Sequence, residues 1–172
     1  TYNFQDFFPF LSNPVKISID KNVKVKLDKS YKNLLHLLSL GRTIYGVNTG
    51  FGRLSQIKIK DSDQSKLQVN LVRSHSAGVG KNLDSGIVRV IMILKVLNYS
   101  HGFSGVHPDT VKKLAQFINN DIIPLVPAKG SVGASGDLAQ LAHIASSIIG
   151  EGKVLQNGKE LHSKAVLKKL KI

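Results

Sequence analysis

A short run of small residues is the part of this sequence best suited to unusual chemistry. Within the segment from Gly130 to Asp137, Ala134-Ser135-Gly136 places a hydroxyl between two residues with little or no side chain. If this loop is compressed, the amide nitrogen of Gly136 can attack the carbonyl carbon of Ala134, because a residue without Cβ allows a close backbone approach. Loss of water from the ring carbonyl and of the Ser135 hydroxyl then leaves a five-membered electrophilic ring with an exocyclic methylene. Ala-Ser-Gly alone is better explained as a glycine-rich helix start with Ser135 or Asp137 as the N-cap.

The residues that follow predict a helix beginning at Asp137. Its apolar positions fall on one helical stripe: Leu138, Leu141, Ala142, Ala145, Ile148 and Ile149. The ring would then lie just before a helix N-terminus, where the macrodipole and the unpaired N–H groups stabilise developing negative charge. An electrophile in this position accepts electrons more readily.

Other catalytic motifs fail on their spacing. Gly78-Val79-Gly80-Lys81 resembles part of a phosphate-binding loop, but His75 and Asn82 stand where that motif needs Gly and Ser or Thr. The runs 102–105 and 133–136 resemble a hydrolase nucleophile elbow, but each lacks the final glycine. The sequence has no cysteine, and none of its six histidines has His-Glu-x-x-His spacing, so we expect no metal site.

The charge of the chain is high but scattered. With 24 basic and 11 acidic residues the formal net charge is +13, which raises nucleic acid as a partner. Only Lys168, Lys169 and Lys171 form a cluster, and no aromatic residue is interleaved with the basic ones as base stacking requires. The most apolar stretch, 87–97, contains an arginine and a lysine and is too short to span a bilayer. We therefore expect a soluble, cytoplasmic protein that binds neither nucleic acid nor membrane.

The remaining segments predict a mainly α fold with small β-hairpins. Residues 15–19 and 23–27 alternate apolar and basic residues around Asp20-Lys21-Asn22, which predicts a hairpin, and Asp28 can then cap a helix. Residues 41–52 are rich in glycine and should form an ordered loop. We expect four further helices (from residue 61 or 62 to before 78, over 85–99, from 108 to 118 and over 163–170), a loop over 121–131, and a hairpin over 154–161 with a type I′ turn.

Three segments together carry a family resemblance. The signature from Gly130 to Leu138, continued by Ala139-Gln140-Leu141-Ala142-His143, closely resembles that of the histidine and phenylalanine ammonia-lyases, whose Ala-Ser-Gly cyclises autocatalytically. Residues 45–52, Tyr-Gly-Val-Asn-Thr-Gly-Phe-Gly, resemble the active-site tyrosine loop of that family. Residues 70–80, Asn-Leu-Val-Arg-Ser-His-Ser-Ala-Gly-Val-Gly, resemble its selectivity segment. The resemblance covers most of the chain from residue 45 to about residue 161.

The resemblance implies a role for each matching residue. Ala134-Ser135-Gly136 would form 4-methylidene-imidazol-5-one, the only cofactor, with no metal or nucleotide. Tyr45 would be the acid/base group near the α- and β-carbons of the substrate. Gly52 would leave room for the substrate amine beside the ring, and Asp137 would support ring formation and the helix start.

His75 bears on the choice of substrate. A histidine here suits a polar substrate ring, imidazole or phenol, because it can donate or accept one hydrogen bond. Its Ser-His-Ser-Ala-Gly context is closer to the histidine enzymes than to the tyrosine enzymes. A helix C-terminal cap is the alternative role for His75. Three residues depart from the family pattern: Gln140 replaces a proline, and Lys95 and Leu97 replace an arginine and an asparagine found in many relatives.

The resemblance thus implies a single N-terminal helical domain over residues 1–172, with an ordered glycine-rich active-site loop, of a larger helical-bundle enzyme. The downstream bundle is absent from this chain. The parent would be a homotetramer that converts L-histidine to urocanate and ammonia. A tyrosine ammonia-lyase or an aromatic aminomutase would share the ring, and a truncated relative could instead have a binding or structural role. The isolated chain is expected to be inactive, since it lacks residues supplied by the bundle and by neighbouring subunits.

Overall fold

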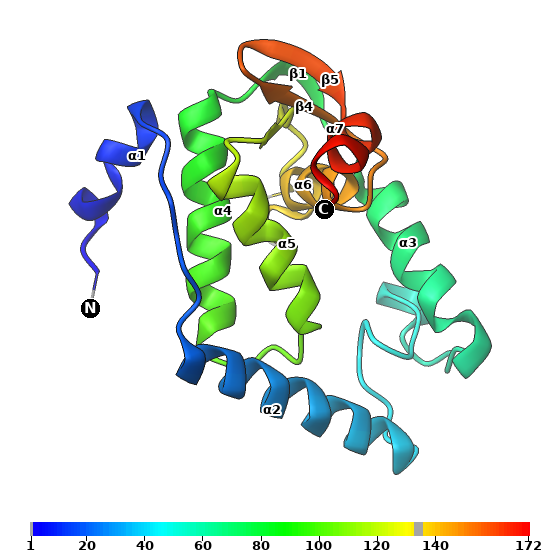
Figure 1. Ribbon diagram of the computed structural model, residues 1–172. Helices are drawn as coiled ribbons and strands as arrows, with labels where there is room; N and C mark the ends of the chain where they lie inside the picture. Colours follow the sequence, from blue (N-terminus) through cyan, green and yellow to red (C-terminus); the bar gives the residue numbers. More distant parts are fainter. Residues whose placement is uncertain (1, 133–135) are drawn as a thin grey trace.

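The helices α4 (Ser85–Ser100) and α5 (Pro108–Asn119) lie side by side and carry much of the buried apolar surface (Figure 1). α4 begins where the side chain of Asp84 accepts the Gly86 N–H at 2.8 Å, and α5 has Pro108 in its first turn, where no intrahelical N–H bond is lost. The spacing of four apolar residues in the sequence predicts one core face for α5, and all four are buried: Val111, Leu114, Phe117 and Ile118.

The computed structural model describes residues 2–132 and 136–172. The other helices are η1 (Phe4–Phe7), α1 (Pro9–Ser12), α2 (Lys21–Ser39), η2 (Gly52–Leu54), η3 (Asp61–Asp63), α3 (Gln64–His75), α6 (Leu138–Ile148) and α7 (Ser163–Leu170). The strands are β1 (Val79–Asn82), β2 (Ile123–Pro124), β3 (Pro127–Lys129), β4 (Lys153–Gln156) and β5 (Lys159–His162). The predicted fold class, mainly α with small β elements, is confirmed. Among the described residues no helix has the length and apolar character needed to cross a membrane.

Two small antiparallel sheets join segments that are distant in the sequence. The order in the larger sheet is β2-β4-β5, and β1 pairs with β3 across a register shift. The hairpin predicted over 154–161 is confirmed as β4 and β5, with Asn157 and Gly158 at φ of 50° and 72°, as a type I′ turn requires. The loop predicted over 121–131 is wrong in part, because this segment supplies both β2 and β3.

The hairpin predicted over 15–27 is wrong. Residues 14–20 have no regular structure, and α2 begins at Lys21 after Asp20, whose side chain accepts the Asn22 N–H at 2.7 Å. This is the N-cap contact predicted further along the chain for Asp28, which instead lies inside α2.

The sequence 23–27 explains the error, because its alternation satisfies two periods. Val23 and Leu27 are two alternating apolar positions of a strand, but they are also one helical turn apart. Leu27 is buried and Val23 packs against the core, whereas Val25 between them is 66% exposed. Burial therefore follows the helical period and leaves the middle valine in solvent.

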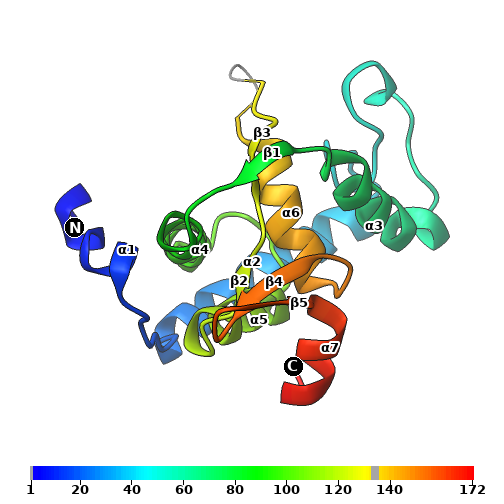
Figure 2. The same cartoon turned by 90° about the horizontal axis from the view of Figure 1, so that it is seen from above.

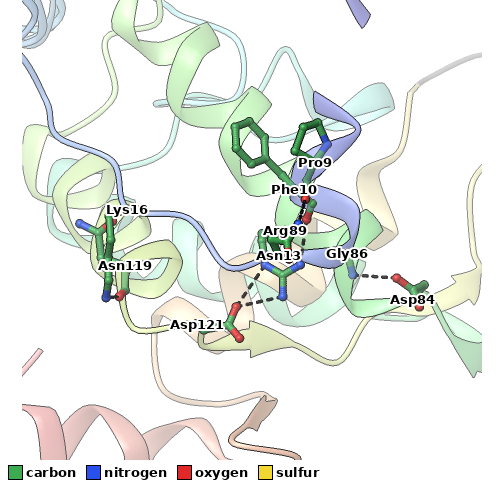
Figure 3. A network of polar contacts seen from close by, with 9 residues as sticks. All are labelled: Pro9, Phe10, Asn13, Lys16, Asp84, Gly86, Arg89, Asn119 and Asp121. Atoms are coloured by element: carbon green, nitrogen blue, oxygen red, sulfur yellow. Dashed lines mark hydrogen bonds and ion pairs between the residues drawn. The ribbon is translucent and has the colours of Figure 1, made fainter. Parts of the chain in front are cut away.

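A polar network fastens the N-terminal segment to the helical core (Figure 3). The Arg89 side chain, almost wholly buried, donates to the Phe10 carbonyl oxygen at 2.8 Å and to Asp121 Oδ1 at 3.0 and 3.1 Å. A buried cation is costly unless it is paired and hydrogen-bonded, so these contacts hold the segment in one place.

Contacts at two further places, Asn119 and Gly86, extend this attachment. The Ile17 N–H donates to Asn119 Oδ1 at 2.7 Å, the Asn119 amide returns a bond to the Ile17 carbonyl at 2.9 Å, and Lys16 Nζ donates to the Asn119 carbonyl. At Gly86 the backbones touch, since an added Cβ would lie 1.8 Å from the Leu11 carbonyl oxygen. A glycine is therefore required where α1 crosses α4.

Candidate active site

A largely apolar cavity of about 470 Å³ lies between α3, α6 and the neighbouring ends of α4 and α5. α3 and α6 are side by side, and α6 follows the loop that leaves β3 (Figure 2). Two of the residues singled out from the sequence, Tyr45 and His75, line the cavity. The apolar lining is Phe51, Leu71, Val72, Tyr99, Leu114, Leu138, Leu141, Ala142, Ile144, Ala145 and Ile148. The tyrosine and selectivity segments, separate in sequence, therefore meet at one concave surface.

The loop over 41–52 is ordered, as predicted, because buried polar side chains hold its backbone. Asn48 is almost wholly buried; its Oδ1 accepts the Ile44 N–H at 2.8 Å and its Nδ2 donates to the Arg42 carbonyl at 2.9 Å. From α3, Gln68 Nε2 donates to the Gly46 carbonyl at 3.0 Å. Neither role was predicted from the sequence: Asn48 lies within the 45–52 motif without a role of its own there, and Gln68 belongs to no motif.

Tyr45 itself is 63% exposed, and two contacts orient its side chain. The Gly52 N–H donates to its hydroxyl at 3.3 Å, and its ring lies edge-on to Phe51 with centroids 5.5 Å apart. Phe51 in turn lies edge-on to His75 at 6.4 Å. The structure therefore brings Tyr45, Gly52 and His75 together around Phe51, a residue not singled out from the sequence.

His75 is the last residue of α3, so it occupies the helix end and lines the cavity at once. Its Nδ1 lies 2.9 Å from the Leu71 carbonyl oxygen. A carbonyl only accepts, so this contact requires a proton on Nδ1 and makes Nε2 the acceptor nitrogen of the neutral ring. Geometry thus combines the two roles that the sequence left as alternatives, a helix-end residue and a polar group at the cavity.

The segment expected to form the ring is described only in part. Ala134 and Ser135 lie outside the described residues. Gly136 has a φ of 82°, in the left-handed region that favours glycine, and is exposed. Asp137 is the N-cap residue of α6, with its carbonyl accepting the Leu141 N–H at 3.1 Å, but its side chain makes no capping hydrogen bond.

Gln140, which replaces the proline of the family signature, is buried in the first turn of α6. Its Nε2 donates to the Ala128 carbonyl at 3.4 Å, and its Oε1 is a buried oxygen with no hydrogen-bond partner within residues 2–132 and 136–172. The unpaired Gln140 Oε1 can accept a hydrogen bond near the start of α6, and the backbone of Gly136 has the conformation of a glycine-specific turn. Both features are compatible with a polar group at this place. The residues present therefore fit the predicted ring.

The apolar stripe predicted for α6 faces the cavity. Its members Leu138, Leu141, Ala142, Ala145 and Ile148 line the cavity, and Leu141 and Ile148 also pack against the core. Leu138 and Ile149 are 49% and 42% exposed. The helix also contacts β2 and α7, and the Ser147 carbonyl accepts a hydrogen bond from Ser163. The buried residues of α6 are Ala139, Gln140, Ala142, Ile144, Ser146 and Ser147.

Charged groups near the cavity are few. The Lys95 ammonium, at a position that departs from the family pattern, lies 4.5 Å from the centroid of the Tyr99 ring, a cation–π contact. Outside the cavity, Arg73 and Glu151 form a two-bond ion pair that joins α3 to the turn after α6, with Nε to Oε2 at 2.8 Å. No group of three or more His, Asp or Glu side chains in the described ranges is arranged to bind a metal ion.

Comparisons with known proteins match nearly the whole chain. A family model described as aromatic amino acid lyase matches residues 3–172. The histidine ammonia-lyase of Salmonella arizonae is 45% identical over 157 residues, which cover 91% of this chain and 31% of that protein. The chain therefore spans about a third of the length of the curated relatives it matches.

Solved structures agree with this match. A histidine ammonia-lyase from Trypanosoma cruzi superposes with a TM-score of 0.84 at 30% identity, covering 96% of this chain and 32% of that chain. A tyrosine aminomutase from Streptomyces globisporus superposes with a TM-score of 0.90 at 33% identity, covering 100% of this chain and 32% of that chain.

Proposed function

Since the chain belongs to the aromatic amino acid lyase family, we propose that it is the N-terminal part of a histidine ammonia-lyase. The observation that carries this proposal is that Tyr45 and His75 line the same cavity, beside the helix that follows Ala134-Ser135-Gly136. The 45% identity to a histidine ammonia-lyase supports it. The parent enzyme would work as a homotetramer.

The proposed reaction is an elimination. A proton leaves the β-carbon of L-histidine, the Cα–N bond breaks, and a double bond forms between the two carbons, giving urocanate and ammonia. Tyr45 is the acid/base residue, because it lines the cavity and its hydroxyl, held by a hydrogen bond from the Gly52 N–H, can exchange a proton with the substrate. Gly52, without a side chain, leaves room for the substrate amine.

Ala134-Ser135-Gly136 would hold the methylidene-imidazolone, which supplies an electrophilic carbon beside the start of α6. Gly136 contributes the ring nitrogen, and its positive φ is one that a residue with Cβ rarely adopts. The N-terminal N–H groups of α6 favour negative charge at this point, and Asp137 supports the helix start. His75 recognises the imidazole ring of the substrate by accepting a hydrogen bond from it at Nε2.

Mass spectrometry and a turnover assay on the full-length protein test this proposal. We expect urocanate to form from L-histidine, and the peptide containing residues 134–136 to be lighter by about 36 Da, the mass of two waters. Ser135→Ala should lose both the mass deficit and the activity. Ser104→Ala, at an exposed serine of another loop, is the matched control and should retain both. An unmodified peptide in active enzyme, or a fully active Ser135→Ala variant, would exclude the proposed ring.

Two outcomes would redirect the proposal. The 172-residue chain alone should form no measurable urocanate; turnover within a few-fold of the full-length enzyme would mean that the chain holds a complete site. Release of ammonia from tyrosine, or conversion of tyrosine to a β-amino acid, in preference to turnover of histidine would identify a tyrosine lyase or aminomutase. The TM-score of 0.90 to a tyrosine aminomutase makes that assay a necessary part of the test.

A further inference from the structure

Three backbone segments meet around Gly78, three residues after His75. The first is the turn that follows α3, the second is β3, and the third is α6. A Cβ added to Gly78 would lie 3.0 Å from His143 Nε2 and 3.2 Å from Pro127 Cβ. The turn is therefore packed directly against a side chain of α6 and against the strand that leads to the proposed ring segment.

Gly130 packs equally closely against Gly78 and α6. A Cβ added to Gly130 would lie 2.9 Å from Ala139 Cβ and 3.1 Å from Gly78 Cα. Gly130 is the residue at which the loop carrying Ala134-Ser135-Gly136 begins, and Ala139 is in the first turn of α6. The turn after His75 thus touches the start of that loop as well as the helix that follows it.

One hydrogen bond joins the turn after α3 to α6. The Gly78 N–H donates to Nε2 of His143 at 3.1 Å, across 65 residues of sequence. His143 is half-buried, and burial lowers the pKa of its imidazole below the ordinary value. The ring is therefore neutral at pH 7, with its proton on Nδ1 and an acceptor lone pair on Nε2, which is the form that can receive the Gly78 N–H.

We propose that His143 is a positioning residue: by accepting the Gly78 N–H, it holds the turn after His75 against α6 and so fixes where His75 lies relative to the start of that helix. This inference rests on the proposed function, in which His75 reads the substrate. His143 itself is not among the residues that line the cavity, so it acts through the backbone of the turn. His75 ends α3, and the hydrogen bond from Gly78 to His143 links the turn that follows it directly to α6.

The place of the Gly78–His143 hydrogen bond predicts whether its loss affects substrate binding or the chemical step. His75 contacts the substrate ring, remote from the carbons that react, so a displaced His75 weakens substrate binding more than it slows the chemistry. Loss of the link should therefore raise KM for histidine and change kcat little. A general loss of folded enzyme would do the reverse, lowering the apparent kcat at constant KM.

The experiment compares three variants of the full-length protein. His143→Leu removes the acceptor, and we expect KM for histidine to rise by roughly 3- to 30-fold, the effect of losing one partly buried hydrogen bond, with kcat within about threefold of wild type. His143→Gln places an amide oxygen at a similar reach and should restore KM to within about threefold. His36→Leu, at an exposed histidine of α2, is the matched control and should behave as wild type.

A fourth variant separates positioning from packing. In a His75→Phe background, His143→Leu should leave KM unchanged, because the residue it positions no longer reads the substrate. An undiminished effect in that background would overturn the proposal. So would a His143→Gln variant that matches His143→Leu, since an acceptor at this position would then have no function.

A further measurement does not depend on activity. Hydrogen exchange of the Gly78 amide should be slow in wild type and in His143→Gln, and faster by about tenfold or more in His143→Leu, as expected for a protected amide that loses its acceptor. If wild type does not turn over histidine, the proposed function fails on that observation alone. The exchange rates then still decide the link: equal protection in all three proteins would refute it.

Discussion

The core between α4 and α5 and the cavity face of α3 and α6 are held by different kinds of contact. In the core, Phe117 and Val88 have no exposed surface and are surrounded by apolar side chains. At the cavity, Tyr45 and Leu138 are 63% and 49% exposed, and the segments are tied by a few polar bonds. Close packing fixes the core. The cavity face is held by single hydrogen bonds, and several of its side chains are exposed.

The largest expected effect is on the free energy of unfolding, when one side chain in each region is truncated. Phe117→Ala should lower the free energy of unfolding by about 3–5 kcal/mol, because it leaves a cavity among buried side chains. Leu138→Ala, on the exposed side of α6, should cost less than about 1 kcal/mol. Urea unfolding of the 172-residue chain, followed by circular dichroism, measures both. Equal costs would mean that the cavity face is as tightly packed as the core.

A smaller effect concerns function at the cavity face. His75→Phe removes the polar group that is proposed to read the substrate, and kcat/KM for histidine should fall by about 10- to 100-fold while phenylalanine gains relative to it. The peptide containing residues 134–136 should keep its mass deficit, because His75 lies outside the loop. The measurement is kcat/KM for histidine, tyrosine and phenylalanine in the full-length protein. An unchanged ratio among the three would reduce His75 to a helix-end residue.

The smallest effect concerns the ion pair at the edge of the cavity face. The hydrogen bond from Arg73 lowers the pKa of Glu151, so the pair stabilises the folded state above the ordinary pKa of a glutamate and loses this contribution as pH falls through the lowered value. Both groups are exposed, so the contribution is small and is screened by salt.

A thermal series tests the ion pair. The Tm of wild type should exceed that of Glu151→Gln slightly at pH 7 and low salt, and the difference should shrink in acid and in high salt. A difference that persists at a pH where Glu151 is protonated would assign the effect to packing. Glu160→Gln, on β5, provides a matched exposed control.

Local patterns predicted much of the fold. The Asn157-Gly158 turn, Pro108 at the start of α5 and the spacing of Val111, Leu114 and Phe117 each specify a conformation through their own neighbours. The segment 23–27 was predicted wrongly because an alternating pattern of five residues fits a strand and a helical turn alike. Only packing against the core chooses between them, and that choice is set by contacts distant in sequence.

The helix α6 shows the same limit at the candidate site. Its apolar stripe was predicted from the sequence, but the burial of polar Gln140 and Ser147 was not. The Gln140 side chain donates to the Ala128 carbonyl, and the Ser147 side chain donates to the carbonyls of His143 and Lys153. Ala128 and Lys153 lie outside α6, so these contacts are not visible in its helical periodicity. Tyr45 and His75 could be named from motifs. Their meeting through Phe51, and the bond from Gly78 to His143, depend on tertiary structure.

The attachment of the N-terminal segment has a consequence for the order of events during synthesis. The Ile17 N–H reaches its acceptor on Asn119 across 102 residues of chain. At a translation rate of about 5–20 residues per second, Asn119 is made roughly 5–20 s after Ile17. During that interval the aromatic residues of η1 and α1 have left the ribosome before the surface that receives them exists. The segment that contains η1 and α1 is therefore made well before the residues that hold it, and it is among the last parts of this region to reach its final place.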